Sequence, residues 1–183
     1  MVLQETVFNL KDGRRAVLRS PLKSDAEEMI QFLVRVYGET DFLLRYPEEF
    51  EDMPVSREEA FLGNLSDDPN VIMIACLVDG RIVGNAQISF LSGMKIGHRA
   101  SVAITVFKDY WGLGIGTRLF EEMFRIARER GGIRQIELDY IEGNQRARAL
   151  YEKMGFCITG VKPDSIRLKD GTFVNEIMML KRL

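Results

Sequence analysis

Residues 103–130, AITVFKDYWGLGIGTRLFEEMFRIARER, combine three kinds of local structure in one run. The first five residues are apolar or β-branched and favour a strand. The turn that follows has glycine at positions 112, 114 and 116. Apolar side chains then recur with the helical period of about 3.6 residues, with charged residues between them. A strand, a glycine-spaced turn and a helix start together expose free backbone N–H groups, so this stretch predicts an anion site.

The composition is typical of a globular chain. The 183 residues are 46% hydrophobic and 28% charged, which fits one domain over residues 1–183. The formal net charge of −2 gives no electrostatic reason to expect binding to nucleic acid or to an anionic membrane. No apolar run approaches the roughly 20 residues that span a bilayer.

A cytoplasmic location is expected. Residues 1–13 have neither the basic start nor the apolar segment of a signal peptide. Cys76 and Cys157 lie far apart in apolar runs without metal or redox spacing, so both are expected to be buried thiols in a reducing compartment. His98 is the only histidine, so no metal site is expected.

Two serines are expected to begin helices in the first third of the chain. Ser24 is followed three residues later by Glu27, and Ser56 by Glu59, which is the spacing of a capping box. Residues 37–55, between the two helices, mix aromatics, acids and prolines and are expected to be irregular.

The turn signals in the rest of the chain predict the fold class. Asp-Gly pairs at 79–80 and 170–171 favour hairpins, and glycines at 131–132 and 155 favour helix ends. The expected order is β-β-α-α-β-β-β-α-β-α-β-β. From it we expect an α+β fold whose mixed, mostly antiparallel sheet contains six to seven of these strands. The late strands are expected at 156–160, 166–168 and 173–180. Helices are expected on both faces, with a single parallel crossover through the central helix.

A glycine loop alone is compatible with several ligands. The phosphate-binding loop of NTPases would need a lysine after Gly116, and none is there. The dinucleotide fingerprint fits Gly112 and Gly114 but has Thr117 where its third glycine belongs. The strands that precede the loop also disagree with that fold, in which the fingerprint is usually early. A turn that needs glycine only for its shape is a further alternative.

Two motifs together resemble a known superfamily. They are Val106-x4-Trp111-Gly112-Leu113-Gly114-Ile115-Gly116 and Asn144-x2-Ala147-x2-Leu150-Tyr151-x3-Gly155-Phe156. The pair resembles the GCN5-related N-acetyltransferase (GNAT) superfamily, and the expected strand order matches that fold over nearly the whole chain. Trp111 departs from the pattern, since the family often has Gln or Arg there. Residues 166–178 resemble the branch that contains ribosomal-protein N-terminal and small-amine acetyltransferases.

The resemblance implies acetyl-CoA as the donor, with no metal. The family's fourth and fifth strands splay apart, and the backbone of Ile104, Thr105 and Val106 would pair with the pantetheine arm there. The N–H of Val106 would donate to the thioester oxygen. The pyrophosphate would lie against the glycine loop, which consists of Trp111, Gly112, Leu113, Gly114, Ile115, Gly116 and Thr117.

Two side chains of the second motif are expected at the same site. Asn144 and Tyr151 are seven residues apart and share a helix face. By resemblance, the Asn144 amide binds the pantetheine, and the Tyr151 hydroxyl is the general acid that protonates the departing thiolate. The alternatives are that Asn144 is only a helix N-cap and Tyr151 only a core residue. The glycine loop upstream favours the functional roles over these alternatives. Lys153 is the first choice among the nearby basic residues for a CoA phosphate.

Asp139 is the expected general base. It lies five residues before Asn144, which matches the position of the base in the ribosomal-protein branch, and Glu137 shares its face of the strand. The alternatives are that Asp139 is only a solvated carboxylate, that a water chain removes the proton, or that Glu48 or Glu49 does so.

The acceptor is expected across the splay from CoA. Residues 37–55 and a turn near 163–169 would bound its pocket, with Phe42, Tyr46, Glu48 and Glu49 as candidate lining residues. The expected activity is direct transfer of acetyl to a primary amine of a small molecule or peptide. Alternatives are N-terminal acetylation of a protein, such as a ribosomal protein, and a CoA-binding sensor without catalysis. The expected partners are acetyl-CoA and the amine, and a homodimer is left open.

Overall fold

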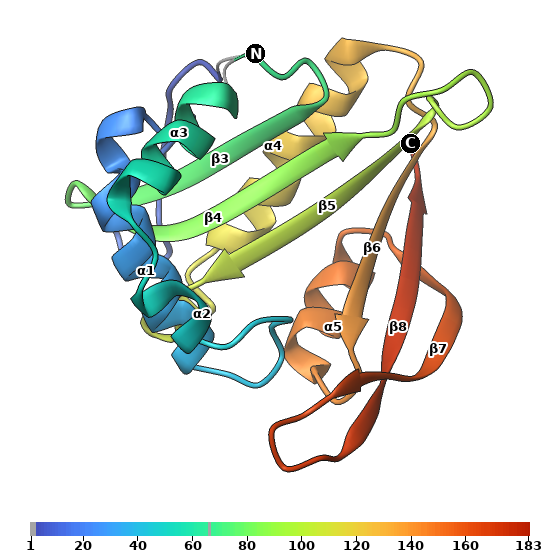
Figure 1. Cartoon of the computed structure of the whole chain (residues 1–183). Helices are drawn as coiled ribbons and strands as arrows, with labels where there is room; N and C mark the ends of the chain where they lie inside the picture. The colour runs from blue at the N-terminus through green and yellow to red at the C-terminus, as the bar shows by residue number, and fades with distance from the viewer. Residues whose placement is uncertain (1–2, 66) are drawn as a thin grey trace.

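The computed structural model describes residues 3–65 and 67–183 (Figure 1). The strands are β1 (Thr6–Asn9), β2 (Arg15–Arg19), β3 (Val71–Val78), β4 (Arg81–Phe90), β5 (Arg99–Val106), β6 (Gln135–Ile141), β7 (Cys157–Arg167) and β8 (Phe173–Arg182). The helices are α1 (Ala26–Gly38), α2 (Glu48–Glu51), α3 (Val55–Leu65), α4 (Ile115–Arg130) and α5 (Gln145–Lys153), with 3-10 turns η1 (Lys23–Asp25) and η2 (Lys108–Tyr110). The expected α+β order is confirmed, and α2 is added inside the segment expected to be irregular.

Within the described residues, eight strands form one sheet, in the order β1-β2-β3-β4-β5-β6-β8-β7. All neighbours are antiparallel except β5 and β6, which are joined by the crossover through α4. The sheet therefore has the mixed character that the sequence predicts, with eight strands instead of six or seven. The stretches expected as separate strands at 156–160 and 166–168 belong to one strand, β7, whose register shifts between Lys162 and Ile166.

Helices cover both faces of the sheet, as expected. Figure 1 shows α1 and α3 in front of the sheet and α4 behind it. The apolar positions predicted for α4 are its buried side: Leu119, Phe120 and Met123 are at most 1% exposed. On the front face, Met29 and Phe32 of α1 are at most 2% exposed. No helix in the described part of the chain is long and apolar enough to cross a lipid bilayer.

Three local expectations are wrong. Ser24 does not cap α1, because it lies inside the turn η1, where the Asp25 carboxylate binds Arg19 at 2.6 Å. Ser56 does not cap α3, because that helix already begins at Val55. Cys157 is exposed, whereas Cys76 is buried as expected. The apolar run around Cys157 forms part of the exposed strand at the edge of the sheet.

The parallel contact between β5 and β6 is short. The two strands pair only at Arg99–Gln135, Ala100–Ile136 and Ser101–Glu137. After these pairs β5 remains bonded to β4, and β6 to β8. The strands then diverge, which confirms the splay, and Figure 1 shows the opening between them at the end where α5 begins.

Candidate active site

The divergence leaves one backbone edge of β5 without a neighbouring strand. The N–H of Phe107 donates to the carbonyl of Val83 beside β5, at 3.0 Å. Backbone groups of an antiparallel strand point alternately to its two sides, so the N–H and C=O groups of Val106 and Ile104 point away from β4. The backbone groups expected to pair with an extended ligand therefore face the splay.

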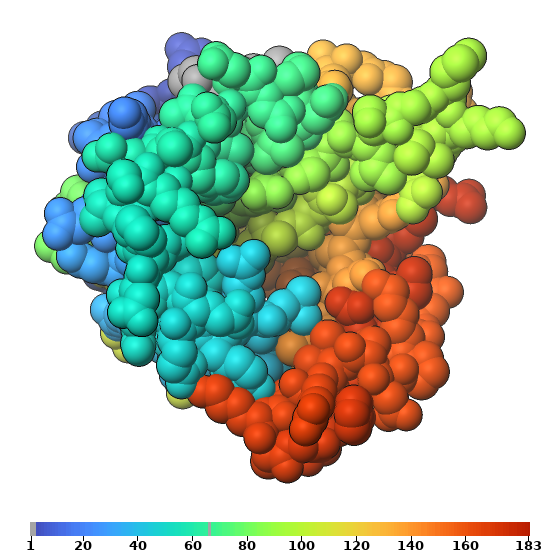
Figure 2. Space-filling model, viewed as in Figure 1, coloured from blue at the N-terminus to red at the C-terminus, as the bar shows by residue number. Residues whose placement is uncertain are grey.

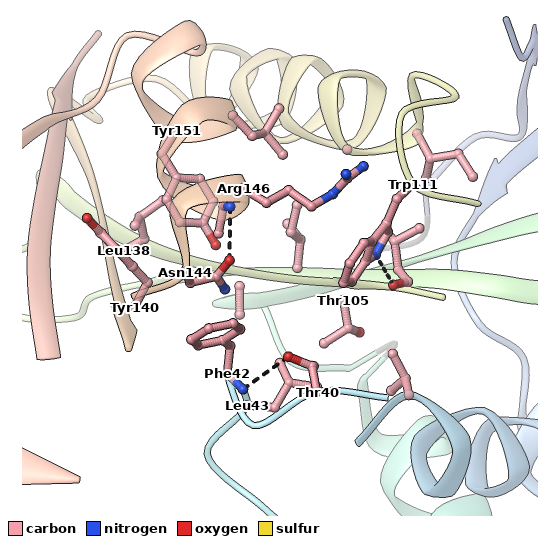
Figure 3. A pocket seen from close by; sticks show the side chains of 18 of the residues that line it. Thr40, Phe42, Leu43, Thr105, Trp111, Leu138, Tyr140, Asn144, Arg146 and Tyr151 are labelled. Carbon is pink, nitrogen blue, oxygen red and sulfur yellow. Dashed lines mark hydrogen bonds between the residues drawn. The ribbon is translucent and has the colours of Figure 1, made fainter. Parts of the chain in front are cut away.

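A cavity of about 450 Å³ lies in the splay (Figure 3). Its walls come from β5, the glycine loop, β6, α5 and the segment after α1. The predicted site residues that line it are Phe42, Ile104, Thr105, Val106, Trp111, Gly112, Gly114, Ile115, Gly116, Thr117, Asp139, Asn144, Tyr151 and Lys153. Leu113 is not among the lining residues; its side chain packs against the core and its carbonyl accepts the N–H of Lys11 at 3.1 Å.

The glycine loop needs its glycines for two different reasons. Gly112 has φ of 79° and Gly114 has φ of 101°, a region that side chains with a Cβ rarely adopt. At Gly114, the N-cap of α4, no atom lies within 4 Å of where a Cβ would be, so the space beside the backbone is open. At Gly116 a Cβ would lie 2.8 Å from Leu150, so this glycine lets α4 approach α5.

Trp111 connects the glycine loop to the strand edge. Its indole Nε1 donates to the carbonyl of Val106 at 2.7 Å. The Arg146 guanidinium lies 4.6 Å from the centre of the indole ring, a cation–π contact. Figure 3 shows the indole between Thr105 and Arg146 at the cavity wall.

Asn144 is a helix N-cap and also faces the cavity. Its Oδ1 accepts the backbone N–H of Ala147 at 3.1 Å, which satisfies one free donor of α5. The same side chain lines the cavity, and Figure 3 shows it beside Tyr151. The capping bond uses only the oxygen, so the amide N–H₂ group keeps both of its donors for a ligand.

Tyr151 lies within an aromatic cluster. Its ring centroid is 5.7 Å from that of Phe120, 5.8 Å from that of Tyr140 and 6.3 Å from that of Phe156. Burial raises the pKa of Tyr151 to about 12, with a smaller contribution from Tyr140. The phenol is therefore neutral at physiological pH and retains a proton that it can donate.

The two acids of β6 have different partners. Glu137 accepts two hydrogen bonds from Arg99 at 2.6 and 2.7 Å, and these lower its pKa. Asp139 accepts a hydrogen bond from the Lys162 ammonium, which also donates to Glu176 at 3.0 Å. The pKa of Lys162 is raised, first by Asp139 and then by Glu176. Asp139 and Glu176 line the cavity, whereas Glu137 does not.

The segment after α1, residues 39–48, forms a strap across the open end of the splay. At its start the Glu39 carboxylate accepts the backbone N–H of Lys108 at 2.6 Å. In its middle Phe42 packs against the turn before α5, since a Cβ at Gly143 would lie 3.5 Å from the Phe42 ring. Figure 1 shows the strap reaching from the front helices toward α5.

The far end of the strap is held by the β7–β8 hairpin. Glu48 binds Lys169 at 2.5 Å, and the Lys169 ammonium lies 4.4 Å from the centre of the Tyr46 ring. The Glu49 carboxylate accepts the backbone N–H of Tyr46 at 2.8 Å. Of the four residues predicted for the acceptor pocket, only Phe42 lines the cavity. Figure 2 shows the strap, in cyan, in contact with the β7–β8 hairpin, in red. A hollow in this face lies above their contact.

Sequence reasoning missed Glu176 and Tyr140, which also line the cavity. Glu176 is brought there by the β6–β8 ladder, in which it lies opposite Ile141. The residues of β8, FVNEIMMLKR, do not alternate between polar and apolar, so the sequence contains no signal for the face of Glu176. Only the pairing register places it beside Asp139.

The chain also matches a family of known proteins. The model of the acetyltransferase (GNAT) family matches residues 32–156, more than half of the chain. The chain belongs to this family. As a GNAT protein it is an N-acetyltransferase, and the residues described above are its candidate catalytic and binding groups.

Individual GNAT relatives agree over most of the length. YdaF of Bacillus subtilis, provisionally named a ribosomal N-acetyltransferase, is 22% identical over 171 residues, which are 92% of this chain and 89% of YdaF. The structure of a GNAT acetyltransferase from Streptococcus pneumoniae has a TM-score of 0.84 and 29% identity, covering 92% of this chain and 99% of that one. YncA from Salmonella typhimurium, solved with its cofactor acetyl-CoA, has the same fold, with a TM-score of 0.75, 16% identity and coverage of 92% and 94%.

Proposed function

We propose that this GNAT protein transfers acetyl from acetyl-CoA to a primary amine of a small molecule or peptide. The observation that carries the proposal is that the free edge of β5 and the start of α4 meet at one cavity. A strand edge can bind an extended amide chain, and a helix start can bind phosphate. Pantetheine and pyrophosphate follow one another in CoA, and the two binding features follow one another along the cavity wall.

The residues at the cavity suit such a donor. The open space beside Gly114 allows close approach to the backbone, and the first turn of α4 contains no acidic residue that would repel a phosphate. Lys11, Arg146 and Lys153 line the cavity and supply positive charge. The Lys153 ammonium donates to Thr117 at 3.1 Å, which holds it beside the glycine loop.

Three groups of the chain are assigned to the chemistry, for which acetyl-CoA supplies the thioester. Asp139 accepts a proton from the acceptor ammonium, and the freed amine attacks the thioester carbon, forming the C–N bond and breaking the C–S bond. The Val106 N–H donates to the carbonyl oxygen, on which negative charge grows during attack. The Tyr151 hydroxyl donates a proton to the departing sulfur. The nitrogen loses its second proton through solvent as it becomes an amide, which restores the Tyr151 hydroxyl, and Asp139 releases the first proton to solvent.

N-terminal acetylation of a protein is the second candidate function, and the name of the relative YdaF favours it. Asp139 is already paired with Lys162, so other groups remain candidates for accepting the proton of the acceptor ammonium. In those routes a water chain, or Glu48 or Glu49 after movement of the strap, takes the proton in place of Asp139.

Release of free thiol from acetyl-CoA, measured across a panel of small amines and peptides, tests the proposal. Acetyl transfer to small amines or short peptides is the expected result. Transfer only to the N-terminus of an intact protein would favour the second candidate. Tight binding of acetyl-CoA without transfer to any acceptor would indicate a CoA-binding sensor and refute catalysis.

A further inference from the structure

Three charged side chains from adjacent strands meet on one face of the sheet. In the β6–β8 ladder Asp139 lies opposite Met178, two residues from Glu176, and in the β7–β8 ladder Lys162 lies opposite Glu176. Opposite residues of antiparallel strands share a face, and so do residues two apart in one strand. The Lys162 ammonium accordingly donates to both carboxylates.

The two carboxylates face the cavity, and the lysine lies toward solvent. Asp139 and Glu176 are lining residues of the cavity, as are Tyr151 and Val106, whereas Lys162 is not. The Glu176 side chain is 14% exposed and that of Lys162 is 43% exposed. A ligand amine that enters the cavity would therefore meet the two carboxylates, and Lys162 does not line the space that the amine would occupy.

The charges at this wall do not cancel. Two carboxylates and one ammonium leave one negative charge. A carboxylate that is largely removed from water, as Glu176 is, is stable only when cations or donors surround it. The group that already bridges the pair is a primary ammonium, so these carboxylates are arranged to bind the same chemical group that an amine acceptor carries.

We propose that Glu176, beside Asp139, binds the ammonium of the acceptor, and that the acceptors are amines with no carboxylate next to the reacting nitrogen. The inference rests on the proposed function of the same cavity. An acceptor that has a carboxylate on the carbon next to the amine would bring this carboxylate close to those of Asp139 and Glu176. Like charges in close proximity repel one another. Alkylamines and peptide N-termini are thus favoured over free amino acids.

Pairs of acceptors that differ only in this carboxylate test the inference. Glycinamide with glycine, leucinamide with leucine, and phenylalaninamide with phenylalanine each compare an amide with a carboxylate beside the same amine. We expect kcat/KM for the amide to exceed that for the free amino acid by about tenfold or more in at least one pair. Equal rates within every pair, faster transfer to the amino acids, or transfer to no member of any pair would overturn the inference.

The variant Glu176→Gln tests the role of the residue itself. We expect KM for the best amide to rise about tenfold or more, as for the loss of a hydrogen bond to a charged group, with a smaller change in kcat. Glu176→Asp, which keeps the carboxylate, should recover part of that loss. Glu142→Gln is the matched control, because Glu142 is a nearby acid bound to Asn175 at 2.9 Å and does not line the cavity.

Binding of acetyl-CoA separates this inference from the proposed function. Its affinity, measured by calorimetry on wild type and on Glu176→Gln, should be the same within about twofold. Absence of binding to the wild type would refute the proposed function. Normal binding with an unchanged KM for the amide in a folded Glu176→Gln protein, or an equal rise in the Glu142→Gln control, would refute the role of Glu176 alone.

Discussion

The indole N–H of Trp111 donates to the carbonyl of Val106 at 2.7 Å. The bond joins the first residue of the glycine loop to the last residue of β5, so the two parts of the proposed donor site are fixed relative to each other. It also occupies the Val106 carbonyl, while the N–H of the same residue faces the splay. The strand edge thereby presents a donor at the position where the thioester oxygen is expected.

Trp111 should report directly on binding of acetyl-CoA. It is the only tryptophan of the chain and it lines the cavity, so its fluorescence comes from the proposed site. Titration with acetyl-CoA is expected to change the emission until saturation, and CoA should compete. Acetate, which has no pantetheine or phosphate, is the control and should have no effect. A constant emission at concentrations that support thiol release would contradict the placement of the donor beside the indole.

Gly114→Ala should weaken donor binding through the backbone. A Cβ at this position meets no atom within 4 Å, but the φ of 101° is unfavourable for alanine by about 1–2 kcal/mol. The first turn of α4 should therefore shift and the Kd for acetyl-CoA should rise about tenfold. Gly80→Ala is the matched control, since Gly80 has φ of 75°, equally open surroundings and a place in the β3–β4 turn. It should lose similar stability and bind acetyl-CoA normally; equal Kd values for the two variants would contradict the prediction.

Tyr151→Phe should lower kcat while acetyl-CoA still binds. The phenylalanine ring can keep the contacts with Phe120 and Phe156, so stability should change little. Loss of the proton donor is expected to lower kcat by about a hundredfold, at the lower end of general acid–base effects. Steady-state kinetics and calorimetry measure the two quantities. A kcat within about twofold of wild type would eliminate the acid role.

The same variant predicts a difference in stability at high pH. The pKa of Tyr151 is about 12 in the folded protein against 10.0 for the free side chain, so the folded state keeps a proton that the unfolded chain loses. This contribution is complete below pH 10 and is lost as the pH rises toward 12. In urea unfolding, wild type should lose roughly 1 kcal/mol relative to Tyr151→Phe between about pH 10 and pH 11.

Other tyrosines should not obscure this comparison. Burial also raises the pKa of Tyr37 and Tyr140, but both are present in the two proteins, so these burial effects cancel in the difference. The interaction of Tyr140 with Tyr151 does not cancel, because it is part of the Tyr151 shift that the comparison measures. Parallel stability curves for wild type and Tyr151→Phe over this pH range would be inconsistent with a buried neutral phenol.

The sequence predicted those parts of the site that are determined locally. The start of α4 follows from glycine positions and apolar period within one stretch, and Asn144 is an N-cap within one turn of the residues that it caps. The side chains beside Asp139 could not be predicted in this way. Glu176 and Lys162 reach it through the β6–β8–β7 register, which includes a shift in β7 and depends on residues far apart in the chain.

The two wrong helix caps have tertiary and local causes. Near Ser24, the ion pair of Asp25 with Arg19 joins the turn to β2 and moves the start of α1 forward. Near Ser56, the carbonyl of Pro54 accepts the N–H of Arg57 at 2.9 Å, so the helix already exists where the serine would cap it. A capping-box spacing is a local preference of about 1 kcal/mol, which such contacts can outweigh.

The three-pair contact between β5 and β6 is the shortest ladder of the sheet, and it lies between the two parts of the sheet. Five strands lie on one side of this contact and three on the other, and the two groups share few ladder bonds across it. Under the proposed function, acetyl-CoA fills the opening as a partial ninth strand and adds bonds that the protein alone lacks. Amide hydrogen exchange at residues 104 and 106 should then slow when the donor binds. The sheet would be most rigid while acetyl-CoA is bound and less rigid after CoA leaves. The average rigidity of the enzyme would therefore depend on the concentration of acetyl-CoA.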